Sequence, residues 1–159
     1  MPDSPETPPY GSYAVLVGTF GAAMTGVSLL ARALGREPRE LTAFDVLALG
    51  GATFKASRTL ARDEVTSFVR APFVAGEAHD GEDEEPTGEG MQRALGELLT
   101  CSRCVGIWVA GGLAATQLLA PRFGRLLVWA LNGAALNDYA QASFTALTAK
   151  SNELEQRAN

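Results

Sequence analysis

The amino-acid sequence predicts an all-α protein, a multi-pass integral membrane helical bundle with three to four transmembrane helices. Of its 159 residues, 47% are hydrophobic and only 19% are charged, below the roughly 25% of ordinary soluble domains. Residues 10–31 carry no charge, whereas seven acidic residues lie between Glu77 and Glu89. A net charge of −5 without a basic patch argues against nucleic acid as a partner. Two cysteines are too few for a disulfide-rich secreted scaffold.

The first expected element is a transmembrane helix over residues 13–34, after a polar N-terminal tail at residues 1–12. The tail contains no Lys or Arg and the apolar run is long, so a cleaved signal peptide does not fit. At about 1.5 Å per residue, a helix of this length crosses a hydrocarbon core of about 30 Å. The alternative is a buried helix of a soluble protein, but such helices rarely run so far without a polar face.

A second, shorter helix is expected over residues 43–62. Its uncharged centre is short, and Lys55, Arg58 and Arg62 follow at spacings that place them on one helical face. Long cationic side chains near the end of a membrane helix reach the interface at modest cost. The segment therefore fits a short span with a cationic end, or a helix that lies in the interface.

Residues 63–100 form the longest polar stretch. Its start, DEVTSFVRAPFV, fits an amphipathic helix on the membrane surface with Val65, Phe68 and Val69 toward lipid. The following GEAHDGEDEEPTGEG is acidic and glycine-rich, so a solvated, disordered linker is expected. It lacks the alternating carboxylates of a calcium loop.

Two further transmembrane helices are expected over residues 103–121 and 125–147, followed by a polar C-terminal tail at residues 148–159. The loop between these helices is short, so they form an antiparallel hairpin. Trp108 and Trp129 lie near the ends of these spans, where tryptophan anchors helices at the membrane interface.

Small residues at four-residue spacing predict the faces through which these helices pack. The two sets are Gly18, Ala22 and Gly26, and Gly106, Ala110 and Ala114.

The arginines that follow the first helix predict its orientation. They place the loop at residues 35–42 in the cytoplasm and the N-terminus outside. With four spans, the loop at residues 122–125 is also cytoplasmic and residues 63–100 face outward. With three spans, that segment turns inward instead.

Two blocks of the sequence resemble a known family. ATFKASRTLARDEVTSFVRAPF (residues 52–73) and GELLTCSRCVGIWVA (residues 96–110) are similar, in this order, to the bacterial membrane family called domain of unknown function 1360. The matching positions are Ala52, Thr53, Phe54, Lys55, Arg58, Asp63, Thr66, Arg70, Pro72, Phe73, Gly96, Glu97, Cys101, Cys104, Gly106 and Trp108. Lys55 stands where the family usually has arginine. The resemblance covers roughly residues 43–149 and implies a bacterial cell-membrane location, but no chemistry.

Cys101 and Cys104 are a candidate thiol pair. Residues three apart on a regular helix hold their Cβ atoms too far apart for a disulfide, so the pair closes only at an irregular helix start. A helix N-terminus and the neighbouring Arg103 favour the thiolate, whereas Glu97 opposes it. Structural packing, thiol redox chemistry and a metal shared between two copies all remain open. The single histidine, His79, lies in the acidic linker, and no cofactor is implied.

The sequence places four polar side chains within predicted spans: Asp45, Lys55, Arg58 and Asp138. Asp138 lies near the middle of the last span, where a carboxylate is unfavourable unless it is paired, protonated or hydrated. We expect it to face Lys55 or Arg58 inside the bundle; a later helix start, with Asp138 at the interface, is the alternative. These residues are too few for an ion pathway.

The chain contains no nucleophile elbow, phosphate-binding glycine loop or zinc-protease helix. We therefore expect a small, non-enzymatic membrane scaffold or partner-binding subunit. Its expected partners are the lipid bilayer and a second copy or another membrane protein. A membrane thiol protein that uses Cys101 and Cys104 is the competing hypothesis.

Overall fold

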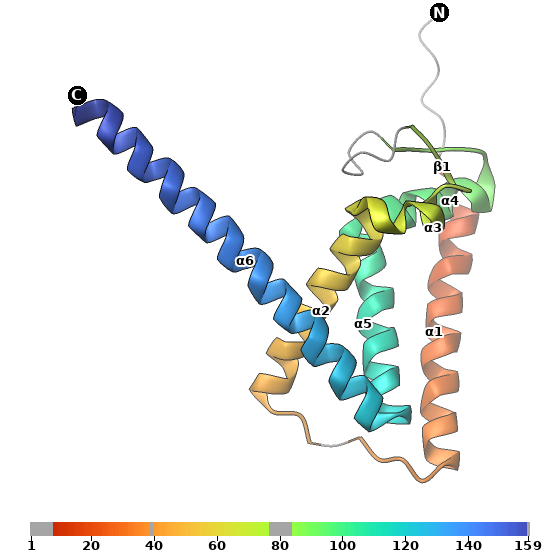
Figure 1. Cartoon of the computed structure of the whole chain (residues 1–159). Helices are drawn as coiled ribbons and strands as arrows, with labels where there is room; N and C mark the ends of the chain where they lie inside the picture. Colours follow the sequence, from red (N-terminus) through yellow and green to blue (C-terminus); the bar gives the residue numbers. More distant parts are fainter. Residues whose placement is uncertain (1–7, 39, 77–83, 159) are drawn as a thin grey trace, which may run out of the picture.

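The computed structural model describes residues 8–38, 40–76 and 84–158, and these residues are almost entirely helical (Figure 1). The α-helices in this part of the chain are α1 (Tyr10–Ala33), α2 (Ala43–Arg62), α3 (Ser67–Arg70), α4 (Gly90–Thr100), α5 (Ser102–Leu119) and α6 (Pro121–Ala158). A 3₁₀ turn, η1 (Glu64–Thr66), precedes α3, and the two-residue strands β1 (Val74–Ala75) and β2 (Glu85–Pro86) pair antiparallel. The prediction of an all-α protein is confirmed.

Local chemistry sets several helix ends. At the start of α2, Thr42 and Asp45 form a capping box in which each side chain accepts a hydrogen bond from the other residue's backbone N–H. At the end of α1, Gly35 adopts a φ of 64°, and the Arg36 N–H donates to the Ala31 carbonyl. This left-handed position favours glycine and lets the chain satisfy terminal carbonyls of the helix. Pro121 begins α6, a position at which the missing N–H of proline breaks no helical hydrogen bond. Residues 122–125, expected as a loop, therefore belong to the first turn of this helix.

The bundle is organised around α2, which packs against both α5 and α6. Helix α1 packs on α5 and α4 and stands at the far side of the bundle from α6 (Figure 1). The short helices α3 and α4 lie across one end of these long helices. We call this end the cap and define it as residues 63–76 and 84–101.

Small side chains dominate the interior. The core cluster comprises Ala48 and Ala52 of α2 with Leu113 of α5 and Val128 of α6. Six of the nine buried apolar residues in the described part of the chain are alanines. Gly51 admits the side chain of α6 residue Asn132, since a Cβ there would lie 2.0 Å from the amide oxygen. The long helices therefore pack through closely approaching backbones.

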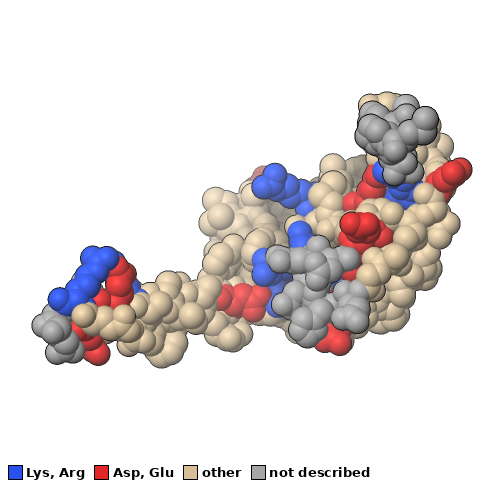
Figure 2. All heavy atoms as spheres, turned by 90° about the horizontal axis from the view of Figure 1, so that it is seen from above, with Lys and Arg blue, Asp and Glu red and all other residues tan. Residues whose placement is uncertain are grey.

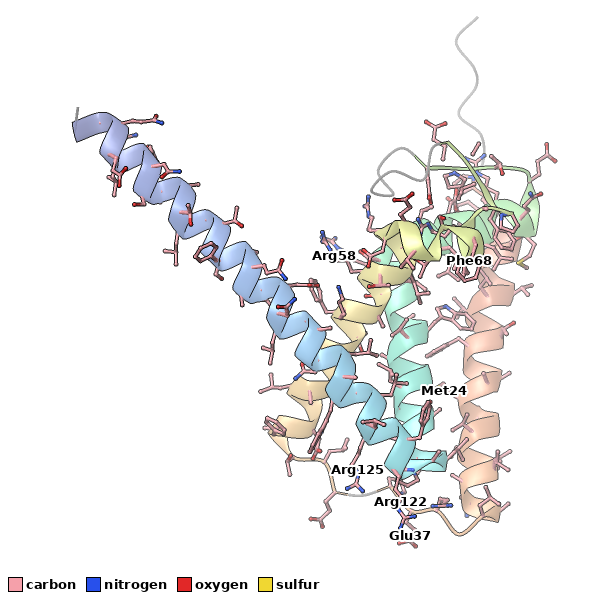
Figure 3. The ribbon with its side chains drawn as sticks, in the orientation of Figure 1. Met24, Glu37, Arg58, Phe68, Arg122 and Arg125 are labelled. Carbon is pink, nitrogen blue, oxygen red and sulfur yellow. A yellow bond between two sulfur atoms is a disulfide. The ribbon has the colours of Figure 1, made fainter. Side chains whose placement is uncertain are left out.

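The packing face of α1 differs from the expected one. Gly18 and Gly26 have no atom within 4 Å of the position of an added Cβ, so this small-residue face is open. On the packed face, Phe20 and Met24 lie against Gly111 of α5, and Figure 3 shows Met24 between the two helices. The expectation was wrong for α1 because a glycine on α5, not on α1, makes room for bulky partners.

The segment between α2 and α5 also departs from the expected solvated linker. Residues 77–83 of the acidic stretch, with His79, lie outside the described residues. On either side of them, β1 and β2 pair, and α4 occupies residues that the sequence assigns to the linker. Val65 and Phe68 of the expected amphipathic segment are 75% and 74% exposed, and Figure 3 shows Phe68 on the cap.

Helix α6 continues far beyond the bundle. Its 38 residues correspond to a length of about 57 Å at about 1.5 Å per residue. The C-terminal half projects away from the other helices as an arm, in side view (Figure 1) and from above (Figure 2). Residues 148–158, expected as a polar tail, continue this helix.

Within the described residues, α1 by itself has the length and apolar composition of a membrane span. Helices α4 and α5 meet at 85° and pass the same criterion only when they are joined as one broken span. An apolar helix so close to the N-terminus also has the character of a signal sequence. The helical part of the sequence prediction is thus confirmed, whereas its multi-pass part is not.

Candidate functional site

The cap is built on a buried ion pair between Arg70, the last residue of α3, and Glu84, which precedes β2. The guanidinium Nε lies 2.6 Å from Glu84 Oε2, and Nη2 lies 2.8 Å from Oε1. The two side chains are 0% and 2% exposed. This two-pronged geometry matches the planar fork of arginine to a carboxylate and fixes the position of both segments.

The same guanidinium ties the cap to the end of α2. Its Nη1 donates to the carbonyl oxygens of Leu60 at 2.7 Å and Asp63 at 3.2 Å, and to Thr66 Oγ1 at 3.1 Å. All three nitrogens of the guanidinium are therefore hydrogen-bonded. Arg70 joins the end of α2, the 3₁₀ turn and the residue before β2, so we expect it to organise the cap and to do no chemistry.

A glycine lets the β1–β2 hairpin lie directly on α4. A Cβ at Gly96 would lie 2.6 Å from the Phe73 carbonyl oxygen and 3.0 Å from the Pro86 Cβ. The same carbonyl accepts a hydrogen bond of 2.9 Å from the Thr87 N–H, and Gln92 Nε2 donates to the Pro72 carbonyl at 3.1 Å. The hairpin and α4 thus form one packed unit.

Glu97 connects the cap to α1. Its carboxylate accepts a hydrogen bond from the Tyr13 hydroxyl and lies 3.1 Å from the Arg93 guanidinium, one helical turn earlier. Through Tyr13, the first helix is anchored at the same end of the molecule as the Arg70–Glu84 pair.

The candidate thiol pair lies where the chain turns from α4 into α5. Cys101 and Cys104 form a disulfide, with their Cα atoms 5.2 Å apart. Cys101 is the non-helical residue before α5, and its sulfur accepts the Cys104 N–H. The irregular helix start that the sequence analysis requires for such a bond is present. The disulfide therefore closes the first turn of α5, directly after the 85° bend between the two helices.

A second polar cluster lies between α2 and α6. Lys55 Nζ is 2.8 Å from Asp138 Oδ2, one of the two pairings expected from the sequence. Their side chains are 23% and 37% exposed. They border an open pocket of about 430 Å³ that Arg58 and Asp63 also line. The pair links α2 to α6 near the point where α6 leaves the bundle.

The predicted site residues do not converge on one centre. Lys55, Arg58 and Asp138 share the pocket, whereas Asp45 belongs to the capping box at the start of α2. The disulfide joins Cys101, the last residue of the cap, to Cys104 of α5. Across the described ranges, His, Cys, Asp and Glu side chains form no group of three that would hold a metal ion.

Sequence reasoning missed Glu84, because it is one acid among seven in a stretch that looks solvated. Only the fold shows that this carboxylate meets Arg70. A signal for the cap was nevertheless present: Arg70 and Thr66 both belong to the motif that carries the family resemblance.

Comparison with known proteins supports this resemblance. The family described as "Protein of unknown function (DUF1360)" matches residues 48–144. A similar curated protein, "Sporulation protein YjcA" of Bacillus subtilis (strain 168), is 29% identical over 94 residues, which cover 52% of this chain and 75% of the relative. No solved structure matches the chain.

Proposed function

The chain belongs to the DUF1360 family of bacterial proteins of unknown function, and from this premise we propose that it is a multi-pass membrane protein with a non-enzymatic, partner-binding role. In this proposal α1, α2, α5 and α6 cross the bilayer, and the cap lies at one membrane surface. The protein acts as a small scaffold that presents helix faces within the membrane and the cap outside it.

One observation carries the proposal: the small side chains are inside and the large apolar ones are outside. The exposed residues include Val17 and Leu47 at 72% each, Leu126 at 67% and Ile107 at 58%, one from each of the four long helices. In water, this exposure would forfeit the hydrophobic gain that drives folding. In lipid it carries no penalty, and membrane helices associate through small residues that allow close backbone approach.

Two features support an orientation with the cap outside. Figure 3 shows Glu37, Arg122 and Arg125 together at the end of the bundle opposite the cap. Arg122 and Arg125 belong to the first turn of α6, and arginines at the ends of membrane helices favour the cytoplasmic side of a bacterial membrane. The cap end holds the Cys101–Cys104 disulfide, which persists in oxidising compartments and is rare in the cytosol. Both features support the four-span arrangement with an external N-terminus.

Cysteine accessibility in intact cells tests this proposal. We introduce Glu89→Cys in the cap and, separately, Glu37→Cys in the opposite loop, and treat cells with a membrane-impermeant maleimide. The native sulfurs are joined and do not react without reductant. We expect Glu89→Cys to be labelled in intact cells and Glu37→Cys only after the membrane is opened. Recovery of the chain in the soluble fraction of a detergent-free lysate would refute the membrane assignment, and equal labelling of both positions would refute the topology.

Thiol chemistry is a second candidate function, favoured by the exposure of Cys104 beside Arg103 at the start of α5. A disulfide that exchanges with external thiols would be reduced and reformed in cells. The redox state of the pair, measured by trapping thiols in rapidly acidified cells, tests this idea. A permanently oxidised pair would leave the disulfide with a structural role at the start of α5. Partial reduction that responds to the growth conditions would favour a redox role.

A further inference from the structure

We propose that the arm of α6 is a self-association surface, on which α6 of a second copy pairs in parallel as a two-stranded coiled coil. This interaction goes beyond the membrane assignment, because it names the partner and the residues that bind it. Five exposed positions of the arm define what we call the α6 seam: Ala140, Phe144, Leu147, Ser151 and Leu154.

The spacing of the seam is that of a coiled coil. Its residues are separated alternately by four and three positions, the a/d pattern of heptad repeats. The same alternation runs back along α6 through Asn137, Gly133 and Ala130, all of which are exposed. Large apolar side chains occupy this repeat at Phe144, Leu147 and Leu154, and the earlier positions carry small or polar residues.

The seam lies on the side of α6 that the bundle does not use. Val128 and Ala135, which are buried against the bundle, each stand two residues before a seam-pattern position, about 200° around the helix. On the open side, Phe144 and Leu147 are 72% and 71% exposed and Leu154 is 55% exposed. From above, Figure 2 shows the arm as an uncharged rod between the bundle and a charged tip.

Charges beside the seam select a second copy in parallel orientation. With Leu147 and Leu154 at d positions, Lys150 occupies g and Glu155 occupies e. In a parallel dimer, each g residue faces the e residue five positions later on the partner helix, so Lys150 of either copy meets Glu155 of the other. Within one chain, Glu155 has no ion-pair partner among the described residues, and Lys150 pairs with Glu153 at an exposed position.

A polar residue of the heptad pattern just before the seam helps to fix the register of the pairing. Asn137 occupies an a position, where a single asparagine specifies the alignment and the two-stranded state. Gly133 precedes it and, like Ala130, allows the two backbones to approach closely in the half of α6 that we assign to the membrane. The outer half carries the larger side chains, which suit an interface that excludes water.

The test measures self-association of the full chain in density-matched detergent by sedimentation equilibrium. We expect Leu147→Glu to weaken the dimer by at least about 100-fold, because a charge then occupies the apolar seam. Ala149→Glu is the matched control: it introduces the same charge two residues away on the outer side and should change the dissociation constant less than about twofold. Unchanged far-UV circular dichroism verifies that both variants fold.

A charge exchange tests orientation and partner together. Lys150→Glu and Glu155→Lys should each weaken the dimer about fivefold, since two symmetry-related pairs become repulsive. The double variant should recover the parental affinity, and a mixture of the two single variants should form mixed dimers preferentially.

A monomeric parent chain, insensitivity to Leu147→Glu or failure of the double exchange to recover affinity would overturn the inference. These outcomes are independent of the membrane assignment, which the cell fractionation tests separately.

Discussion

Replacement of Glu84 by glutamine isolates the electrostatic role of the cap's buried ion pair. Glutamine keeps the length and shape of the side chain and one carbonyl oxygen but removes the charge. In the structure, both carboxylate oxygens bind the Arg70 guanidinium at 2.6 and 2.8 Å. The variant therefore leaves a buried cation with one of these two acceptors and no counter-charge.

The expected loss of stability follows from the burial of the Arg70–Glu84 pair. Arg70 and Glu84 are 0% and 2% exposed, so water cannot replace the lost carboxylate. Removal of one partner from a buried pair typically destabilises by about 3–5 kcal/mol. Because the amide oxygen still accepts one hydrogen bond and Nη1 keeps its three contacts, we expect a loss of about 3 kcal/mol, at the lower end of that range.

Hydrogen exchange at the Thr87 amide reports this loss locally. Its N–H donates to the Phe73 carbonyl across the cap, so exchange requires the hairpin to open. A loss of about 3 kcal/mol corresponds to exchange more than about 100-fold faster. Glu85→Gln, which changes an exposed neighbour, is the control and should alter the rate little. An acceleration below about threefold in Glu84→Gln would refute the argument that this pair holds the cap together.

Three further predictions concern the bundle and the bend. Asp138→Asn should lower the stability of the chain in detergent by about 1–2 kcal/mol, because its ion pair with Lys55 is only partly buried. The loss should be smaller in a Lys55→Met background, and equal losses in both backgrounds would show that the two side chains are not coupled. Gly96→Ala should lower the stability measured by thermal unfolding by about 1–3 kcal/mol, because the added methyl group would meet the Phe73 carbonyl oxygen. Gly112→Ala, where an added Cβ has no atom within 4 Å, is the control and should be neutral or stabilising. Similar unfolding midpoints for the two variants would count against the close contact at Gly96. Replacing both Cys101 and Cys104 by serine should lower stability by about 2 kcal/mol, as expected for loss of a disulfide that closes a short loop. Dithiothreitol should lower the stability of the parent chain by the same amount and leave that of the variant unchanged.

Particular residues show how far sequence reasoning reached into the site. The pairing of Asp138 with a cation of α2 was predictable, because a carboxylate in a long apolar stretch needs a partner and only a few cations are available. The close approach of Cys101 and Cys104 required an irregular helix start, and the sequence places the pair where α5 begins. Glu84 could not be predicted, since nothing in its local sequence distinguishes it from its acidic neighbours.

Composition and periodicity by themselves determined that this chain is helical, because long uncharged runs without strand-like alternation satisfy their backbone hydrogen bonds within each helix. Short sequence motifs likewise indicated the family to which the chain belongs. The tertiary structure decided which faces meet: α1 packs through Phe20 and Met24 rather than through its glycines, and a carboxylate from an acidic stretch is buried in the cap. Which faces pack together depends on the shape and charge of two surfaces that are distant in the sequence. The residue pattern of one helix describes only one of these surfaces.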